Sequence, residues 1–219
     1  MTAASAAAGD ARTEILGRIR AALADRGARA DVEVRWDYGQ PVSTGDKDVV
    51  QRFVERVADY RAAVVRVGPE KVPGAIAEAL RTAGAGAVIA DAALRDRWAG
   101  GGGADWLLDD RCSAAELDRI DAVVTTATVG IANTGTLVLD HGPGQGRRAI
   151  SLVPDVHICV VHSDQIVSDV PEAVARLVDS GRHTRPLTWI SGPSATSDIE
   201  LDRVEGVHGP RTLHVIVAG

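Results

Sequence analysis

Aromatic residues are scarce in this sequence, and their scarcity constrains how the core can be built. Phe, Trp and Tyr make up 3% of the 219 residues, whereas 45% are hydrophobic and 25% are charged. A core made mainly of Ala, Val, Ile and Leu suits helices packed on a parallel sheet better than an aromatic-rich sandwich. The overall balance is typical of a globular protein, and the length favours one domain over two.

Basic residues, cysteines and long apolar runs are also few, which disfavours several classes of function. The formal net charge is −6 and the pI is about 5.5, so no nucleic-acid partner is expected. Cys112 and Cys159 are far apart, which fits neither a disulfide framework nor a zinc motif. No run approaches a membrane span, and residues 1–10 lack the basic region of a secretion signal. We therefore expect a cytoplasmic protein, and the scarcity of lysine beside abundant Ala, Gly and Arg indicates a GC-rich bacterial source.

The first part of the chain predicts a tail, a helix and a connection. Residues 1–12 are expected to form a flexible tail. Ile15, Leu16, Ile19 and Leu23 then follow helical spacing over 13–26, so this helix either packs on the domain or docks a partner. We expect one domain over 13–219. Its N-terminal helix and an extended connection occupy 13–45, and its α/β core occupies 46–219.

The next segment alternates helices and short β-branched runs. Apolar spacing predicts a helix over 46–61, a strand over 63–67, a helix over 69–81 with proline in its first turn, and a strand over 87–90. Such alternation predicts the α/β class, with a mostly parallel sheet flanked by helices and right-handed crossovers. The four glycines of 100–103 lack the spacing of a phosphate-binding motif and indicate a surface loop.

Polar residues gather in the second half, where strands should end. In the run Asn133-Thr134-Gly135-Thr136, amides and hydroxyls could approach an anion or carbonyl, although a tight turn between strands explains them equally well. Arg147 and Arg148 follow a glycine-rich turn. They could grip a carboxylate or phosphate through paired hydrogen bonds, or be solvated or paired with acidic neighbours.

Three further segments carry residues of types that bind ligands. His157 and Cys159 share one face of a strand over 156–161, but two ligands do not define a metal site and core packing is favoured. After a strand over 187–190, a predicted helix start brings together four hydroxyl groups that could receive an anion or cap the helix: Ser191, Ser194, Thr196 and Ser197. His208, beside Gly209 in a constrained loop, could reach a ligand, although alone it would be a surface histidine.

Four blocks, taken in order, resemble the signature of a known family: TVGIANTGTLVLD, GQGRRAISLVPDVHICVV, ISGPSATSDIE and EGVHGP. They are similar to the LUD-domain family, in its lactate utilization protein C branch, and the resemblance covers most of the chain. It implies a fold similar to glucosamine-phosphate deaminase, ribose-phosphate isomerase and CoA transferases. It also implies a role in oxidising L-lactate to pyruvate beside iron–sulfur partner proteins.

Two departures limit what the resemblance implies. Many family members have Glu where this chain has Asn133, and related CoA transferases use a glutamate as a covalent nucleophile. An amide cannot replace that carboxylate, which argues against such chemistry here. Two separated cysteines cannot supply the four thiolates of a usual cluster. We therefore expect no cofactor in this chain and iron–sulfur clusters in its partners.

The leading hypothesis is an accessory subunit of a lactate-oxidising system that binds a small carboxylate or phosphate, with His208 as the candidate for proton transfer. The first alternative is an independent enzyme of the sugar-phosphate isomerase or CoA transferase type, with Asp140 or Asp198 as its acid or base. The second is a non-catalytic regulatory module. The expected ligand-binding residues, with no metal ligand among them, are Thr134, Gly135, Thr136, Arg147, Arg148, Ser191, Gly192, Ser194, Asp198, His208 and Gly209.

Overall fold

The computed structural model describes residues 3–24, 40, 42–45, 47–99, 103–109, 111–193 and 209–219, with side chains from residue 11 onward. The chain forms two units, Met1–Tyr38 and Gly39–Gly219. In the first, helix α1 spans Ala3–Ala22, so it includes most of the segment 1–12 predicted to be a flexible tail. The correction has a simple cause: that segment is rich in Ala, the strongest helix former. Ile15, Ile19 and Leu23 are exposed along α1.

The first half of the larger unit follows the predicted alternation closely. Helix α2 is capped by Asp48, whose side chain accepts from the amide of Gln51, and it buries Phe53 and Val57. Gly84, in a left-handed conformation, ends α3. The elements are α2 (Val49–Asp59), β1 (Ala63–Val67), a 3-10 helix (Pro69–Lys71), α3 (Val72–Ala83), β2 (Ala87–Ala90), α4 (Ala92–Trp98), β3 (Asp105–Leu108) and α5 (Ala114–Leu117).

The second half contains the two longest strands, Val156–His162 and Thr212–Ala218, together with several elements of two to four residues. Three strands lie between residues 122 and 139, because the chain leaves the parallel sheet after the first of them and enters another sheet. The elements are β4 (Ala122–Thr126), β5 (Val129–Ile131), β6 (Thr136–Leu139), β7 (Val156–His162), β8 (Ile166–Val167), α6 (Val170–Asp179), β9 (Thr188–Ile190) and β10 (Thr212–Ala218), with 3-10 helices at Arg148–Ser151, Ser163–Gln165 and Arg182–Thr184.

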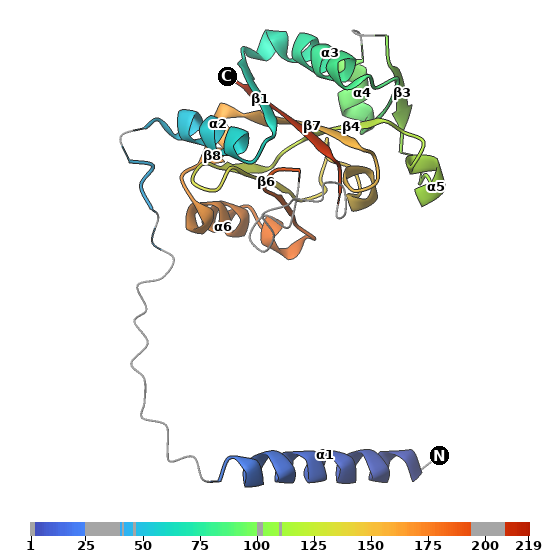
Figure 1. The fold of residues 1–219 in the computed structure, drawn as a ribbon, viewed down its shortest axis with the longest axis vertical. Coiled ribbons are helices and arrows are strands. Elements are labelled where there is room, and N and C mark those ends of the chain that lie inside the picture. Colours follow the sequence, from blue (N-terminus) through green and yellow to red (C-terminus); the bar gives the residue numbers. More distant parts are fainter. Residues whose placement is uncertain are drawn as a thin grey trace. The chain divides into compact units, whose positions relative to one another are not determined.

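Two sheets build the larger unit (Figure 1). The main sheet has six parallel strands in the order β1-β10-β7-β4-β2-β3. The second has the order β8-β5-β6-β9, with β6 antiparallel to both of its neighbours. The predicted α/β class, with a mostly parallel sheet flanked by helices, is confirmed.

Hydrophobic clusters show how the layers pack. Helices α3 and α4 cover one face of the main sheet. On its other face, α2 and strands β6 and β8 share a cluster with β7 and β10. Helix α6 covers the outer face of the second sheet, against β5 and β6. None of the helices in the described part of the chain is both long and apolar enough to cross a bilayer.

Candidate functional site

The Thr134–Thr136 segment forms the turn between β5 and β6, where three hydroxyl groups bind one another. The Oγ1 atoms of Thr134 and Thr136 are 2.7 Å apart, and the Oγ of Ser191 is 2.7 Å from Thr136 Oγ1. Gly135 has a φ of 58°, and a Cβ there would lie 2.7 Å from the carbonyl carbon of Arg56 in α2. Glycine is therefore required by close packing on α2 as well as by backbone conformation.

Gly192 and Asn133 also have structural contacts beside this turn. A Cβ on Gly192 would lie 2.7 Å from the Cβ of Tyr60, and its φ is 74°. The side-chain amide of Asn133 donates to the carbonyl of Val42 over 3.1 Å, while the Val42 amide donates to Asp169. Because a carboxylate cannot donate a hydrogen bond, the amide at position 133 has a role here that glutamate could not fill.

Arg147 is held by protein groups. Its Nη2 lies 2.8 Å from one carboxylate oxygen of Asp109, its Nε contacts the other, and Nη2 also donates to the carbonyl of Cys112. Asp109 raises the pKa of the Arg147 guanidinium above its usual value. This two-point pairing matches the acidic-neighbour alternative, and it occupies the donors that would bind a carboxylate.

Arg148 lies in a different network, beside a histidine that sequence reasoning did not single out. Its Nη1 donates to Thr188 Oγ1 over 2.8 Å, and the Nε2 of His141 is 2.8 Å from the same oxygen. His141 Nδ1 is 3.0 Å from the carbonyl of Gly146. A neutral ring with its proton on Nδ1 satisfies every contact, since Thr188 can then accept from Arg148 and donate to Nε2.

Asp140, next to His141, is a buried carboxylate that holds two arginines. Its Oδ2 accepts from Arg182 over 2.7 Å and from Arg185 over 3.0 Å, while Oδ1 accepts from Thr128 over 2.9 Å and from the amide of Gly142 over 3.1 Å. Burial raises the pKa of Asp140, but the bonds from Arg182, Thr128 and Gly142 outweigh it, and the pKa lies below its usual value. A carboxylate held ionised by four donors is a poor acid or base.

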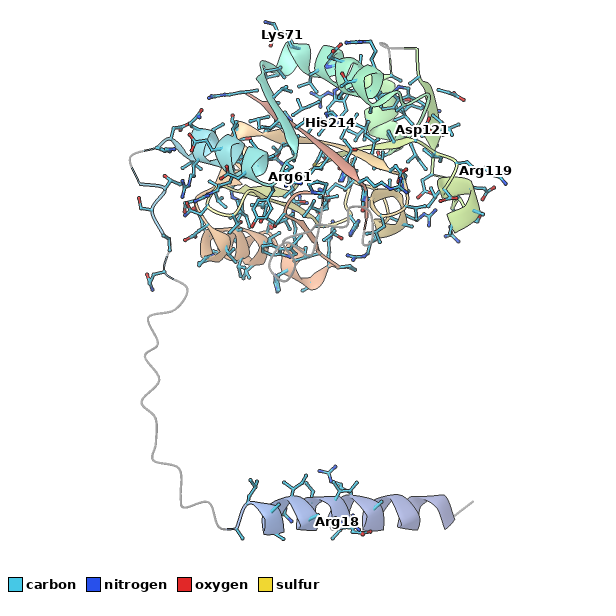
Figure 2. All side chains as sticks on the ribbon, in the orientation of Figure 1. Arg18, Arg61, Lys71, Arg119, Asp121 and His214 are labelled. Atoms are coloured by element: carbon cyan, nitrogen blue, oxygen red, sulfur yellow. The ribbon has the colours of Figure 1, made fainter. Side chains whose placement is uncertain are left out.

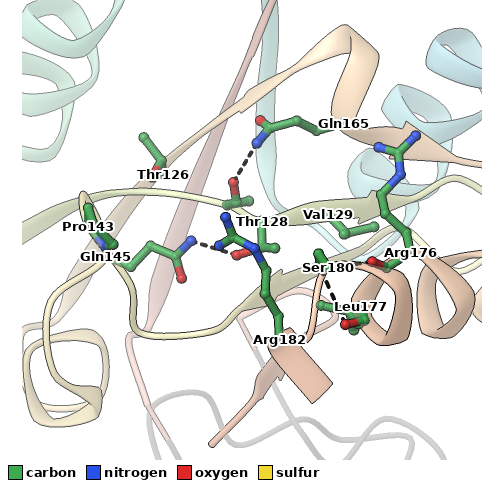
Figure 3. Close-up of a pocket in the computed structure, with 11 residues that line it drawn as sticks. Thr126, Thr128, Val129, Pro143, Gln145, Gln165, Arg176, Leu177, Ser180 and Arg182 are labelled. Carbon is green, nitrogen blue, oxygen red and sulfur yellow. Dashed lines mark hydrogen bonds between the residues drawn. The ribbon is translucent and has the colours of Figure 1, made fainter. Parts of the chain in front are cut away.

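A pocket of about 250 Å³ lies beside this carboxylate (Figure 3). It sits where β4 ends at Thr126, and ligands of open α/β sheets bind at the carboxyl ends of the strands. Two arginines and no acidic residue occur among the described residues that line it. These are Thr126, Ala127, Thr128, Val129, Pro143, Gln145, Gln165, Arg176, Leu177, Ser180 and Arg182.

Both glutamines of the pocket are fixed by hydrogen bonds. Gln145 Nε2 donates to Thr128 Oγ1 over 2.7 Å, and Gln145 Oε1 accepts from the amides of Asp140 and His141. Gln165 Nε2 donates to the carbonyl of Ala127 over 3.0 Å, and its Oε1 accepts from a backbone amide. These contacts fix the positions of the polar groups around the pocket before any ligand enters.

The two arginines of the pocket retain donors. Figure 3 shows Arg182 extending toward Thr128 and Gln145, with Arg176 on the side of Gln165. Among the residues that the structure describes, Arg182 donates one hydrogen bond, to Asp140, and Arg176 donates one, to the carbonyl of Asp164. A guanidinium group carries five N–H donors, so both can still bind an anion.

The second sheet separates the residues that the sequence suggested as one site. In the β6–β9 ladder, Leu137 pairs with Ile190 and Leu139 with Thr188. The Thr136–Ser191 contact is therefore at one end of the ladder and Arg148 at the other, roughly 10 Å away at about 3.4 Å per residue. A Cβ on Gly209 would meet no described atom within 4 Å. Ser194, Asp198 and His208 lie outside the described residues, as do Thr196 and Ser197.

His157 and Cys159 belong to the core. Thr125 Oγ1 is 2.8 Å from His157 Nε2 and 3.6 Å from Cys159 Sγ, and all three side chains are buried. Burial lowers the pKa of His157 to about 4 and raises the pKa of Cys159 to about 12. Both are neutral near pH 7. Within the described ranges, no group of three metal-ligating side chains occurs.

Comparison with known proteins defines the class to which this fold and site belong. The LUD-domain family matches residues 46–218, and the chain belongs to that family. A protein named "Lactate utilization protein C" from Deinococcus radiodurans is 49% identical over 211 residues, which are 96% of each chain. One of the same name from Bacillus pumilus is 26% identical over 84% of each chain.

The fold is also similar to a solved structure. A crystal structure of a DUF162 family protein from Deinococcus radiodurans superposes with a TM-score of 0.68 and 47% sequence identity. The similarity covers 82% of this chain and 100% of the other.

Proposed function

We propose that this protein is an accessory component of a cytoplasmic lactate-utilisation system and that it binds a small carboxylate or phosphate in the arginine-lined pocket. Its membership of the LUD-domain family and its 49% identity to a lactate utilization protein C support the first part. The single observation that carries the second part is the pocket itself, where Arg176 and Arg182 meet fixed amides without an acidic residue among the described lining.

The size and charge of the pocket favour a small anion. Its volume of about 250 Å³ is below the ~300–1,000 Å³ typical of sites for larger ligands. Arg182 and Arg185 share the single negative charge of Asp140, so this cluster of described residues carries a net positive charge. A carboxylate such as lactate or pyruvate, or a phosphate, would accept from Arg182 and Arg176 and be oriented by Gln145.

The residues expected from sequence enter this proposal in two ways. Arg148 lies beyond His141 and Thr188, where it adds positive charge near the pocket. His208 stays the predicted residue for proton transfer. The Thr134–Thr136 turn and Ser191 are assigned to the fold instead, because their hydroxyl groups bind one another.

Electron transfer is assigned to partners. Oxidising lactate to pyruvate releases two electrons and two protons, so an acceptor is needed. The chain contains two cysteines, and burial keeps the thiol of Cys159 protonated, whereas a usual iron–sulfur cluster needs four thiolates. We therefore place the clusters in iron–sulfur partner proteins.

The alternative of an independent isomerase or CoA transferase has less support. Asp140, one of its two candidate carboxylates, is ionised and held by four donors. The other, Asp198, lies outside the described residues. Asn133 uses its amide to hold Val42 and offers no nucleophile.

A melt of the full chain with lactate, pyruvate, inorganic phosphate or CoA tests the ligand. Saturation at a hundred times Kd should raise the melting temperature by about 5–10 °C, because the ligand binds the folded state alone. The test variant is Arg182→Gln and the matched control Arg185→Gln. Both remove one bond to Asp140 Oδ2, but only Arg182 lines the pocket.

We expect Arg182→Gln to lose the ligand-induced shift and Arg185→Gln to keep it. A shift that survives in Arg182→Gln would contradict the pocket, and a wild-type protein that responds to none of the four compounds would contradict ligand binding. A response to CoA alone would favour the enzyme alternative.

A further inference from the structure

The outer edge of β1 is an open edge of the main sheet. Strand β1 pairs with β10 along all its residues, from Ala63 opposite His214 to Val67 opposite Ala218. In the part of the chain that the structure describes, no strand pairs with its other side. Alternate backbone N–H and C=O groups of such an edge have no partner in the sheet and can pair with another strand.

Apart from one arginine, this edge lacks the features that usually block strand addition. Natural edge strands carry lysines, prolines or bulges, which prevent another chain from pairing. Strand β1 reads Ala-Val-Val-Arg-Val and keeps a regular register, and Val65 at its centre is 48% exposed. Its one charged side chain, Arg66, donates to the carbonyl of Gly219 over 3.3 Å.

An apolar groove of about 300 Å³ follows the same edge. Val65 and Val67 of β1 form one side, Ala75 and Ala79 of α3 form the other, and Ile216 of β10 contributes to the lining. A groove of this character beside an open edge can receive side chains from an added strand, which would bury the exposed valine as well as pair the backbone.

We propose that the occupant of this edge is β1 of a second copy of the chain. The two strands pair antiparallel across a two-fold axis at Val65, so that the two main sheets join into one. Such an interface is self-complementary, because the same strand supplies both sides. Each Val65 lies beside its equivalent and enters the groove between β1 and α3 of the other copy.

The charges at the two ends of β1 fit this arrangement. Asp59 and Arg61 precede the strand, and Glu70 and Lys71 follow it; all are exposed. Figure 2 shows Arg61 and Lys71 near opposite ends of the strand. Antiparallel pairing brings the start of one strand beside the end of the other, so Arg61 meets Glu70 of the second copy. A parallel arrangement would place like charges together.

The test is the mass of the full chain in solution, by light scattering after gel filtration. We expect twice the 22.9 kDa of one chain for the wild type and a single chain mass for Val65→Asp, which places two carboxylates at the axis. Three matched controls replace apolar side chains that are likewise exposed: Val178→Asp on α6, Leu107→Asp on β3 and Ile19→Asp on α1. Circular dichroism checks that each variant folds.

The controls should remain dimers. A monomeric wild type at 100 µM, a dimeric Val65→Asp, or a control variant that alone dissociates would overturn the proposal. The orientation has its own test: Arg61→Glu should weaken the dimer about two- to thirty-fold, and adding Glu70→Arg should restore it. If the double variant is weaker than the single one, the antiparallel pairing is wrong.

Discussion

The two ends of the β6–β9 ladder are both polar but differ in the groups they carry and in how these groups are used. At the Thr136 end, hydroxyl groups bind one another and Gly135 packs on the backbone of α2. At the Asp140 end, Arg182 and Arg185 share one buried carboxylate, and both arginine side chains are about half exposed. A site for an anion is indicated by donors that stay available, whereas hydroxyl-rich and glycine-rich sequence alone also describes a tight turn.

The largest expected effect breaks the packing at the Thr136 end. Gly135→Ala places a Cβ 2.7 Å from the Arg56 carbonyl carbon at a φ of 58°. We expect the free energy of unfolding to fall by about 2–4 kcal/mol, and the melting temperature by about 4–16 °C. Denaturant unfolding measures the first quantity and a thermal melt the second.

Gly84→Ala is the matched control for Gly135→Ala. Gly84 has a similar φ of 67°, but a Cβ there meets nothing within 4 Å. Gly84→Ala should therefore lower the free energy of unfolding only by the cost of the left-handed backbone conformation, about 1 kcal/mol. Equal losses in the two variants would show that contact with α2 contributes nothing.

The next effect tests the charge at the other end of the ladder. Asp140→Asn leaves Arg182 and Arg185 without their carboxylate, and we expect the free energy of unfolding to fall by about 1–3 kcal/mol. The loss is limited because both arginines are about half exposed. Asp155→Asn is the control, since its pair with Arg211 is exposed and should be worth under ~1 kcal/mol.

The pH dependence of Asp140→Asn follows from the lowered pKa of the wild-type carboxyl. Its stabilising contribution is complete above the pKa of the unfolded chain, about 3.9, and is lost as the pH falls through the lower native pKa. The difference between wild type and Asp140→Asn should therefore shrink below about pH 4. A difference that stays constant to pH 2 would show that the carboxylate is not stabilised by its arginines.

The smallest effect concerns the amide beside the turn. Asn133→Asp replaces the donor to the Val42 carbonyl with a carboxylate, and the Val42 amide already binds Asp169. We expect a loss of about 1 kcal/mol in thermal or denaturant unfolding, and a smaller loss for Asn133→Ala, which adds no charge. If Asn133→Ala lowers the free energy of unfolding as much as Asn133→Asp does, repulsion between the new carboxylate and the Val42 carbonyl contributes nothing.

The elements of the first half could be predicted because their signals are local. The segments 63–67 and 87–90 are strands as expected, since β-branched and apolar runs specify strands within a few residues. The helix α2 likewise follows from the spacing of Phe53 and Val57. The predicted flexible tail over 1–12 falls mostly within helix α1, because its many Ala residues favour a helix.

The pocket could not be predicted in the same way, because its contacts join distant segments. Arg182 is 42 residues from Asp140 and Arg185 is 45 residues away, and they meet only after β9 has paired with β6. The role of Gly135 likewise depends on α2. Gln145 lies in the glycine-rich turn before the arginines, and its role depends on contacts with Thr128, Asp140 and His141 that only the folded chain forms.

The contacts of Val42 couple three segments of the larger unit. Asn133 binds its carbonyl, and Asp169, which also accepts from the amide of Glu172 at the start of α6, binds its amide. One buried carboxylate thus binds both the first turn of a helix and the irregular segment that precedes α2. Ordering of either partner reduces the entropic cost of ordering the other, so the start of α6 and the segment around Val42 should fold and open as one cooperative unit.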